Sequence, residues 1–324
     1  MRKHLAGAIV VLALLAPSAV RAASFSDLIS IGDSLSDGGN VYQATGNLFP
    51  PLPYAQRFSN GPVAVEYLAQ LLGLPMLNLA FGGATTGRTT GPDAEPNFLN
   101  ATRLPSPPFP VLPNMGDTFD EYLATHTVDP LALYVVWGGA NDFFLAQELN
   151  TNPATLVAEL QAAAARAIAN IVGYVGTLQA LGAQTILVPG LPDLGLTPSL
   201  SGGPLQAAAS MLSAQFNDRL RAELLVFDSA IYFDTSALLH EIVANPAAYG
   251  FTNVTEACFD GMAVCDPDPL NWNLYLFWDS VHPTTHAHKI LARQWAIAVP
   301  EPAVMILLSC GVVAALARRQ ARRL

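Results

Sequence analysis

The stretch IGDSLSDGGNVY, residues 31–42, interrupts an apolar region with acidic residues, hydroxyls and two adjacent glycines. It follows the apolar run 28–31, which is typical of a short buried strand. Ser34 therefore lies just past a strand end, where the chain must turn. Two interpretations fit this position. Either Asp33, Ser34 and Ser36 cap a helix, or Ser34 is a nucleophile whose hydroxyl and backbone amide point the same way.

Short apolar runs recur along the chain and alternate with helical stretches. The predicted strands cover residues 28–31, 76–79, 131–137, 185–188 and 230–233. Helical periodicity predicts helices over 63–72, 153–181, 205–227 and 284–298, the second capped by Asn152 and opened by Pro153. Such alternation predicts an α/β fold, a parallel sheet covered by helices on both faces. The segments 87–114 and 246–273 are long loops, which we interpret as insertions in one domain.

Both ends of the chain have the composition of targeting segments. Residues 1–22 combine Arg2 and Lys3 with an apolar run and small residues, as a cleaved secretory signal peptide does. An uncleaved membrane anchor is the alternative. Residues 300–324 hold Pro-Glu-Pro, a short apolar run and four arginines. They resemble the PEP-CTERM sorting signal of Gram-negative bacteria, with a simple anchor as the alternative.

These end segments predict the domain boundaries and the location of the protein. The folded domain is expected over residues 23–299. The resemblance of the tail implies export to the periplasm or cell surface of a Gram-negative bacterium. Export and C-terminal sorting machinery would then be partners, and the tail would contact the membrane before it is removed.

The charge of the chain argues against a nucleic-acid partner. The sequence has 15 basic and 25 acidic residues, of which seven basic and one acidic lie in the two end segments. The domain therefore keeps 8 basic and 24 acidic residues, a net charge of −16. Such a surface repels nucleic acid and anionic headgroups. An apolar content of 52% also excludes a mainly disordered polymer.

Two cysteines flank a turn-rich stretch, CFDGMAVC. We expect Cys258 and Cys265 to form a local disulfide, since an exported protein matures in an oxidising compartment. A metal site is less favoured, because no His or third Cys lies nearby at ligand spacing. No motif for a nucleotide or flavin is found in the sequence, so no metal or cofactor is predicted.

Three further polar groups fall at predicted strand ends. The stretch DSVHP places Asp279 and His282 three residues apart, close enough for a carboxylate to orient an imidazole. VVWGGAND ends near Asn141, whose side-chain amide suits an oxyanion donor or a helix cap. LNLAFGGATT contains Gly82 and Gly83, either of which could turn the chain or expose an N–H group. Sites in parallel sheets collect at the carboxyl ends of the strands, so we expect these groups to converge.

The order Gly-Asp-Ser-Leu, GGATT, Gly-x-Asn-Asp and Asp-x-x-His resembles the GDSL, or SGNH, hydrolase family over nearly the whole region between the end segments. The resemblance implies a flavodoxin-like three-layer α/β/α sandwich with about five parallel strands. It also implies Ser34 as the nucleophile, His282 as the base and Asp279 as the residue that orients His282.

The resemblance further implies an oxyanion hole made of Ser34 N–H, Gly83 N–H and Asn141. The N–H of Gly82 is the alternative to that of Gly83. The implied activity is hydrolysis of a small-molecule, lipid or glycan ester through an acyl-enzyme. Acyl transfer or polysaccharide deacetylation on the same site, and a non-catalytic surface or matrix binding protein, remain alternatives. Apolar residues near these motifs could shape an acyl pocket or simply belong to the core: Leu99, Phe109, Val111, Leu112, Phe143 and Phe144.

Overall fold

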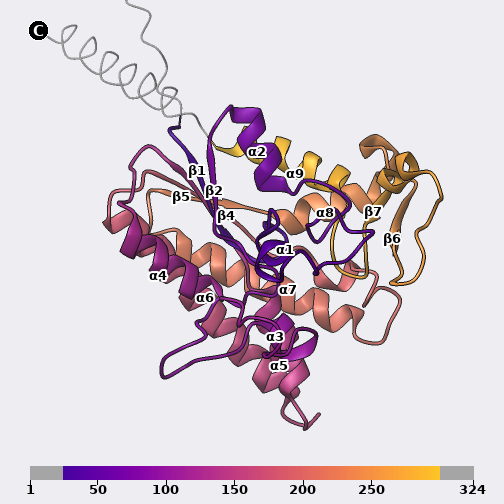
Figure 1. Cartoon of the computed structure of the whole chain (residues 1–324), viewed down its shortest axis with the longest axis horizontal. Coiled ribbons are helices and arrows are strands. Elements are labelled where there is room, and N and C mark those ends of the chain that lie inside the picture. Colours follow the sequence, from indigo (N-terminus) through magenta and orange to yellow (C-terminus); the bar gives the residue numbers. More distant parts are fainter. Residues whose placement is uncertain (1–24, 300–324) are drawn as a thin grey trace, which may run out of the picture. The chain divides into compact units, whose positions relative to one another are not determined.

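Five parallel strands form the main sheet of the computed structural model, which describes residues 25–299 (Figure 1). The strands are β1 (Leu28–Gly32), β2 (Met76–Asn78), β3 (Leu133–Trp137), β4 (Thr185–Pro189) and β5 (Ala230–Phe233). Their order is β2-β1-β3-β4-β5, that of a flavodoxin-like doubly wound sheet. The predicted fold class and five strands are confirmed. β3 begins later than predicted, because Leu131 lies in a turn in which its N–H donates to Asp129.

Successive strand residues face two different apolar layers. In β1, Ile29 and Ile31 pack into one layer and Leu28 into the other. This period of two is the geometry of an extended strand. The first layer is covered by α4 (Met115–Thr125), α6 (Leu156–Ala180) and α7 (Gln206–Leu224). The second is covered by α2 (Ala64–Leu72), α8 (Thr235–Ala244) and α9 (Thr285–Ala298), on the opposite side of the sheet in Figure 1.

Helix α6 begins later than the sequence predicts. Asn152 Oδ1 accepts the N–H of Ala154 at 3.1 Å in a turn, so Pro153 does not open the helix, which starts at Leu156. The prediction of Asn152 as its cap was therefore wrong. Within residues 25–299, α6 is the one helix long and apolar enough to cross a membrane. Its inner face, which includes Ile168, packs against the sheet as a layer of the fold.

The two segments predicted as loops contain short elements. The first holds α3 (Phe98–Thr102), and the second holds η2 (Pro246–Tyr249), β6 (Asn253–Ala257) and η3 (Pro269–Leu274). β6 pairs with β7 (Tyr275–Phe277) in a separate two-stranded sheet. The remaining elements are α1 (Asn40–Ala44), α5 (Ala140–Leu149) and η1 (Leu194–Leu196). The predicted disulfide between Cys258 and Cys265 is confirmed.

The predicted signal peptide, residues 1–22, and the predicted sorting segment, residues 300–324, lie outside the described residues. The boundaries of the 23–299 domain therefore stay a prediction.

Candidate active site

Ser34 lies in the turn that follows β1. Asp33 holds this turn, because its Oδ1 accepts the N–H of Leu35 at 3.0 Å and its carbonyl oxygen accepts the N–H of Ser36. Ser34 is 8% exposed and lines a cavity of about 460 Å³. The turn therefore presents one hydroxyl at the rim of a rigid sheet.

The amides at the start of α1 bind the side chain of Asp37, not those of the three residues considered from the sequence. The Asp37 carboxylate accepts the N–H groups of Gly39, Asn40 and Val41 at 2.6 to 3.2 Å. It also accepts the N–H of Gly82 at 2.9 Å. Burial raises the pKa of Asp37. Asp37 thus ties the turn after β1 to the turn after β2, a link between two distant segments that the local sequence pattern did not reveal.

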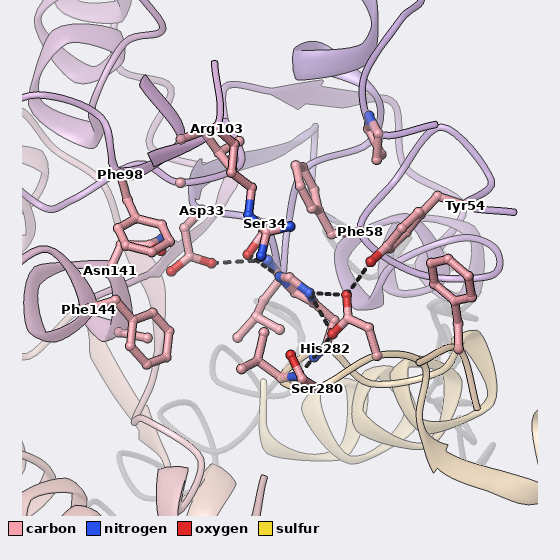
Figure 2. A pocket seen from close by; sticks show the side chains of 18 of the residues that line it. Asp33, Ser34, Tyr54, Phe58, Phe98, Arg103, Asn141, Phe144, Ser280 and His282 are labelled. Atoms are coloured by element: carbon pink, nitrogen blue, oxygen red, sulfur yellow. Dashed lines mark hydrogen bonds and ion pairs between the residues drawn. The ribbon is translucent and has the colours of Figure 1, made fainter. Parts of the chain in front are cut away.

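Ser34, His282 and Asp279 form a continuous hydrogen-bonded relay (Figure 2). His282 Nε2 lies 2.9 Å from Ser34 Oγ. His282 Nδ1 lies 2.8 Å from Asp279 Oδ2 and 3.0 Å from Oδ1. Ser34 and His282 lie 248 residues apart in the sequence, and the fold brings their side chains into direct contact.

The loop before α9 fixes the imidazole. Trp278 N–H donates to the carbonyl oxygen of His282 at 2.7 Å, and Phe277 forms an antiparallel bridge with Pro283. The ring of Phe58 lies 5.3 Å from that of His282, centroid to centroid. Backbone pairing and ring packing together leave the imidazole little freedom to turn away from Ser34.

The pKa values of Asp279 and Asp33, two buried carboxyls near His282, shift in opposite directions. Burial pushes the pKa of Asp279 upward, but the charge and hydrogen bond of His282 lead the opposing contributions, and the net pKa lies below its usual value. By contrast, burial raises the pKa of Asp33 to about 6, with its Leu35 N–H bond and His282 acting in the opposite direction. Asp279 is thus an anion at neutral pH and can stabilise an imidazolium.

The two glycines after β2 differ in what their amides do. Gly82 N–H is donated to Asp37, and a side chain at Gly82 would meet the ring of Phe58 at 2.1 Å. Gly83 lines the cavity beside Ser34. Gly83 N–H is therefore the better placed of the two amides to face a bound oxyanion.

Asn141 is the second residue of α5, is 6% exposed and lines the same cavity. Its Nδ2 donates to the carbonyl oxygen of Ala84 at 3.0 Å. A carboxamide carries two N–H donors, so this contact orients the group and leaves the second N–H for another acceptor.

Asp142 links α5, which carries Asn141, to the turn that carries Gly83. Its carboxylate accepts the N–H of Thr86 at 3.0 Å and the Thr86 hydroxyl at 2.7 Å. Burial, followed by the charge of Glu95, raises the pKa of Asp142 to about 7. From the sequence, Asp142 was only one residue of the VVWGGAND turn, and its role in joining α5 to the GGATT turn required the structure.

The cavity has two aromatic sides, one on either side of Ser34 (Figure 2). Phe98 and Phe144 lie on the Asn141 side, with ring centroids 6.0 Å apart. Tyr54 and Phe58 lie on the His282 side. No pattern in the sequence marked Tyr54 as part of the site.

Only part of the predicted acyl pocket lines this cavity. Leu99 and Phe144 do. Phe143 points into the core, where its ring lies 5.8 Å from that of Phe216. Leu112 and Phe109 pack with Leu99 in an apolar cluster, and Val111 is exposed. Adjacent residues such as Phe143 and Phe144 face different ways on a helix, which the motif alone did not resolve.

The model of the GDSL-like lipase/acylhydrolase family matches residues 28–295. The chain belongs to this family. Membership places it among enzymes that act on ester bonds.

Three relatives show the breadth of the family around this chain. It is 28% identical over 343 residues to the phosphatidylcholine-sterol acyltransferase of Aeromonas hydrophila, covering 90% of this chain and 96% of that protein. It is 31% identical over 312 residues to Esterase EstA of Pseudomonas aeruginosa, covering 83% and 46%. An uncharacterized protein in the trpE-trpG intergenic region of Pseudomonas putida is 34% identical over 320 residues, covering 86% and 51%. The chain thus spans about half the length of the last two relatives.

Among solved structures, the chain is similar to a catalytic mutant of the acetylxylan esterase Axe2 from Geobacillus stearothermophilus, with a TM-score of 0.47 and 18% identity. The match covers 85% of this chain and 94% of that chain.

Proposed function

We propose that the chain is an exported serine esterase in which Ser34 is the nucleophile, His282 the base and Asp279 the residue that orients the base. The observation that carries the proposal is the 2.9 Å contact of Ser34 Oγ with His282 Nε2, with Asp279 on the opposite ring nitrogen. When Nδ1 donates its proton to Asp279, the lone pair of Nε2 points at the Ser34 hydroxyl.

In the first step, His282 Nε2 takes the Ser34 proton while Oγ attacks the carbonyl carbon of the ester. The carbonyl oxygen becomes an oxyanion, which accepts hydrogen bonds from Ser34 N–H, Gly83 N–H and the second N–H of Asn141 Nδ2. The alcohol leaves with the proton from His282. In the second step, His282 deprotonates a water that attacks the acyl-enzyme, which releases the acid and restores Ser34.

We also infer which side of the cavity each half of the ester occupies. Because His282 must protonate the leaving oxygen, the alcohol binds on the His282 side, beside Tyr54 and Phe58. The acyl chain then extends the other way, toward Phe98 and Phe144. Both sides are apolar, which favours a neutral ester with an apolar acyl group.

Hydrolysis of a p-nitrophenyl ester series, from acetyl to dodecanoyl, tests the activity. Ser34→Ala is expected to lower kcat by at least about 10⁴-fold and to abolish labelling by a serine-directed fluorophosphonate. Ser36→Ala is the matched control, since it removes a buried hydroxyl that has no hydrogen-bond partner among residues 25–299. Equal labelling of wild type and Ser34→Ala would favour the alternative of a non-catalytic binding protein.

Acyl transfer is the second candidate. The apolar alcohol side of the cavity, and similarity to an acyltransferase over 96% of that protein, favour an alcohol as acceptor in place of water. A product assay with an added alcohol separates the two reactions. An ester product that grows with alcohol concentration at the expense of free acid supports transfer.

Export is supported by the composition of residues 1–22 and by the Cys258–Cys265 disulfide, which suits an oxidising compartment. The composition of residues 300–324 supports a sorting segment that is removed. Mass spectrometry of protein recovered from a Gram-negative host that processes such tails tests both points. A product that still carries both end segments would contradict them.

A further inference from the structure

Tyr54 reaches the catalytic carboxylate from a distant loop. Its hydroxyl donates to Asp279 Oδ2 at 2.7 Å across a separation of 225 residues (Figure 2). Tyr54 lies between α1 and α2, in a turn in which its own N–H donates to the carbonyl oxygen of Pro51 at 3.1 Å. Burial, followed by the charge of Asp279, raises the pKa of Tyr54, so the hydroxyl keeps its proton and acts as a donor.

The Tyr54 hydroxyl completes the hydrogen bonding of Asp279. Oδ1 accepts the backbone N–H groups of Val281 at 2.9 Å and His282 at 2.7 Å. Both carboxylate oxygens face His282 Nδ1. Oδ2 has Tyr54 as its other donor. Asp279 is only 9% exposed. Without this hydroxyl, its Oδ2 would keep only the imidazole as a partner among residues 25–299.

Ring packing places the hydroxyl independently of Asp279. The Tyr54 ring stands edge-on to Phe259 at 5.6 Å and to Trp278 at 6.0 Å between centroids. Phe259 follows Cys258, so the loop closed by the disulfide supplies one wall for this ring. Trp278 precedes Asp279 in the chain. The donor and its acceptor are therefore held by the same aromatic cluster, as a prepositioned hydrogen bond requires.

We propose that Tyr54 is a positioning residue for the ester hydrolysis proposed above, which it serves by fixing the Asp279 carboxylate against His282. The inference rests on that proposed function. A carboxylate fixed at both oxygens cannot rotate about its bond to Cβ, so His282 stays aimed at Ser34. The hydroxyl dipole also draws negative charge from the carboxylate and weakens its pull on the imidazole proton.

Other titratable groups face the relay and are the same in wild type and variant. The charges of Asp33, at the end of β1, and of His288, in α9, interact with that of His282. Arg103 lines the same cavity, and its charge acts on Tyr54. A comparison that removes only one hydroxyl leaves all three in place, so any change in the titration of His282 is due to that hydroxyl.

The test is Tyr54→Phe, which keeps the ring and its packing. We expect kcat to fall about tenfold with KM changed by less than about twofold. The hydroxyl no longer offsets the carboxylate charge, so the His282 imidazolium is better stabilised in the variant than in wild type. Because the base must be neutral, the rising limb of activity with pH is expected to move upward. Imidazole NMR titration of wild type and variant follows the same change without any substrate.

Tyr67→Phe is the matched control. It removes a hydroxyl that bonds to Thr285 Oγ1 at 2.8 Å, away from the catalytic residues, and should leave kcat and the His282 titration unchanged. An unshifted His282 pKa in Tyr54→Phe, or a change in KM alone, would reduce Tyr54 to a packing role and overturn the inference. If wild type cleaves no ester while the titration still separates Tyr54→Phe from wild type, the proposed function fails and the contact stands.

Discussion

A methyl group added at Gly83 tests both the packing of the turn after β2 and the proposed role of the Gly83 amide. Gly83 has a φ of +74°, in the left-handed region that side chains disfavour. Its new Cβ would lie 2.5 Å from Asn97 Oδ1 and 2.7 Å from Leu99 Cγ. Both neighbours are buried. Gly83→Ala therefore combines backbone strain with a steric clash.

The neighbours of Gly83 have little room to yield. Asn97 Oδ1 accepts the N–H of Leu99 at 2.9 Å, and Asn97 Nδ2 donates to the carbonyl oxygens of Gly82 and Pro113. The left-handed conformation costs about 1 to 2 kcal/mol. Overpacking of a buried site adds about 1 to 3 kcal/mol. The free energy of unfolding should thus fall by about 2 to 5 kcal/mol.

The proposed role of Gly83 N–H adds a catalytic effect. If the turn relieves the clash by moving, the amide leaves its place beside Ser34, and kcat should fall about a hundredfold or more. Gly73→Ala is the matched control. Gly73 has a φ of +67°, yet no atom of residues 25–299 lies within 4 Å of its new Cβ, and it caps α2. It should lose only about 1 to 2 kcal/mol of stability, with kcat unchanged.

Urea unfolding, monitored by tryptophan fluorescence, gives the free energy of unfolding of each variant. Ester hydrolysis at saturating substrate gives kcat. The reasoning is refuted if Gly83→Ala and Gly73→Ala lose the same stability. The assignment of the Gly83 amide is refuted if Gly83→Ala keeps kcat within about twofold of wild type.

Three further predictions follow from the same structure. Asp279→Asn should lower kcat by about 10³- to 10⁴-fold, because an amide does not hold His282 in the required tautomer, and a loss below about tenfold would contradict this. Replacing Cys258 and Cys265 by serine should lower the unfolding free energy by about 2 kcal/mol, the chain-entropy value for their short loop, and reductant should then have no further effect. A variant pair as stable as wild type would contradict it. Burial raises the pKa of Asp142 to about 7 in the folded protein, so folding favours the protonated carboxyl. The stability that this preference contributes is lost as pH rises from about 4, where the unfolded chain ionises, through the folded pKa of about 7. Wild type should be more stable at pH 5 than at pH 7.5 by about 2 kcal/mol from this group, and Asp142→Asn should flatten that dependence; an unchanged dependence would contradict the assignment.

The periodicity of the sequence predicted the sheet well and the short elements poorly. Strands buried on both faces are near-continuous apolar runs, and β5 has the bounds that its run predicts. Short elements such as α1, α3 and β6 were not predicted, because they are too short to show a periodic hydrophobic pattern. The contacts that stabilise them come from other parts of the chain. The start of α6 was misplaced because a local turn at Asn152 competes with the helix.

The candidate site was likewise predicted only in part from the sequence. Local motifs indicated Ser34, Asp279 and His282, because a nucleophile, a base and its orienter each leave a recognisable residue type at a strand end. The same motifs could not rank Gly82 against Gly83, since the difference lies in Asp37, which takes one of the two amides from a neighbouring turn. Their catalytic roles stay a prediction until the variants are measured.

By itself, the sequence determined the α/β class, the five strands and the family, and it indicated candidate reacting groups, because these depend on residue type and on spacing along the chain. Only the tertiary structure decided that Tyr54 meets Asp279 and that Phe144, not Phe143, lines the cavity. A hydrogen bond needs its atoms within about 3 Å. That distance is set by how separate loops pack on the sheet, which no local pattern of residues encodes.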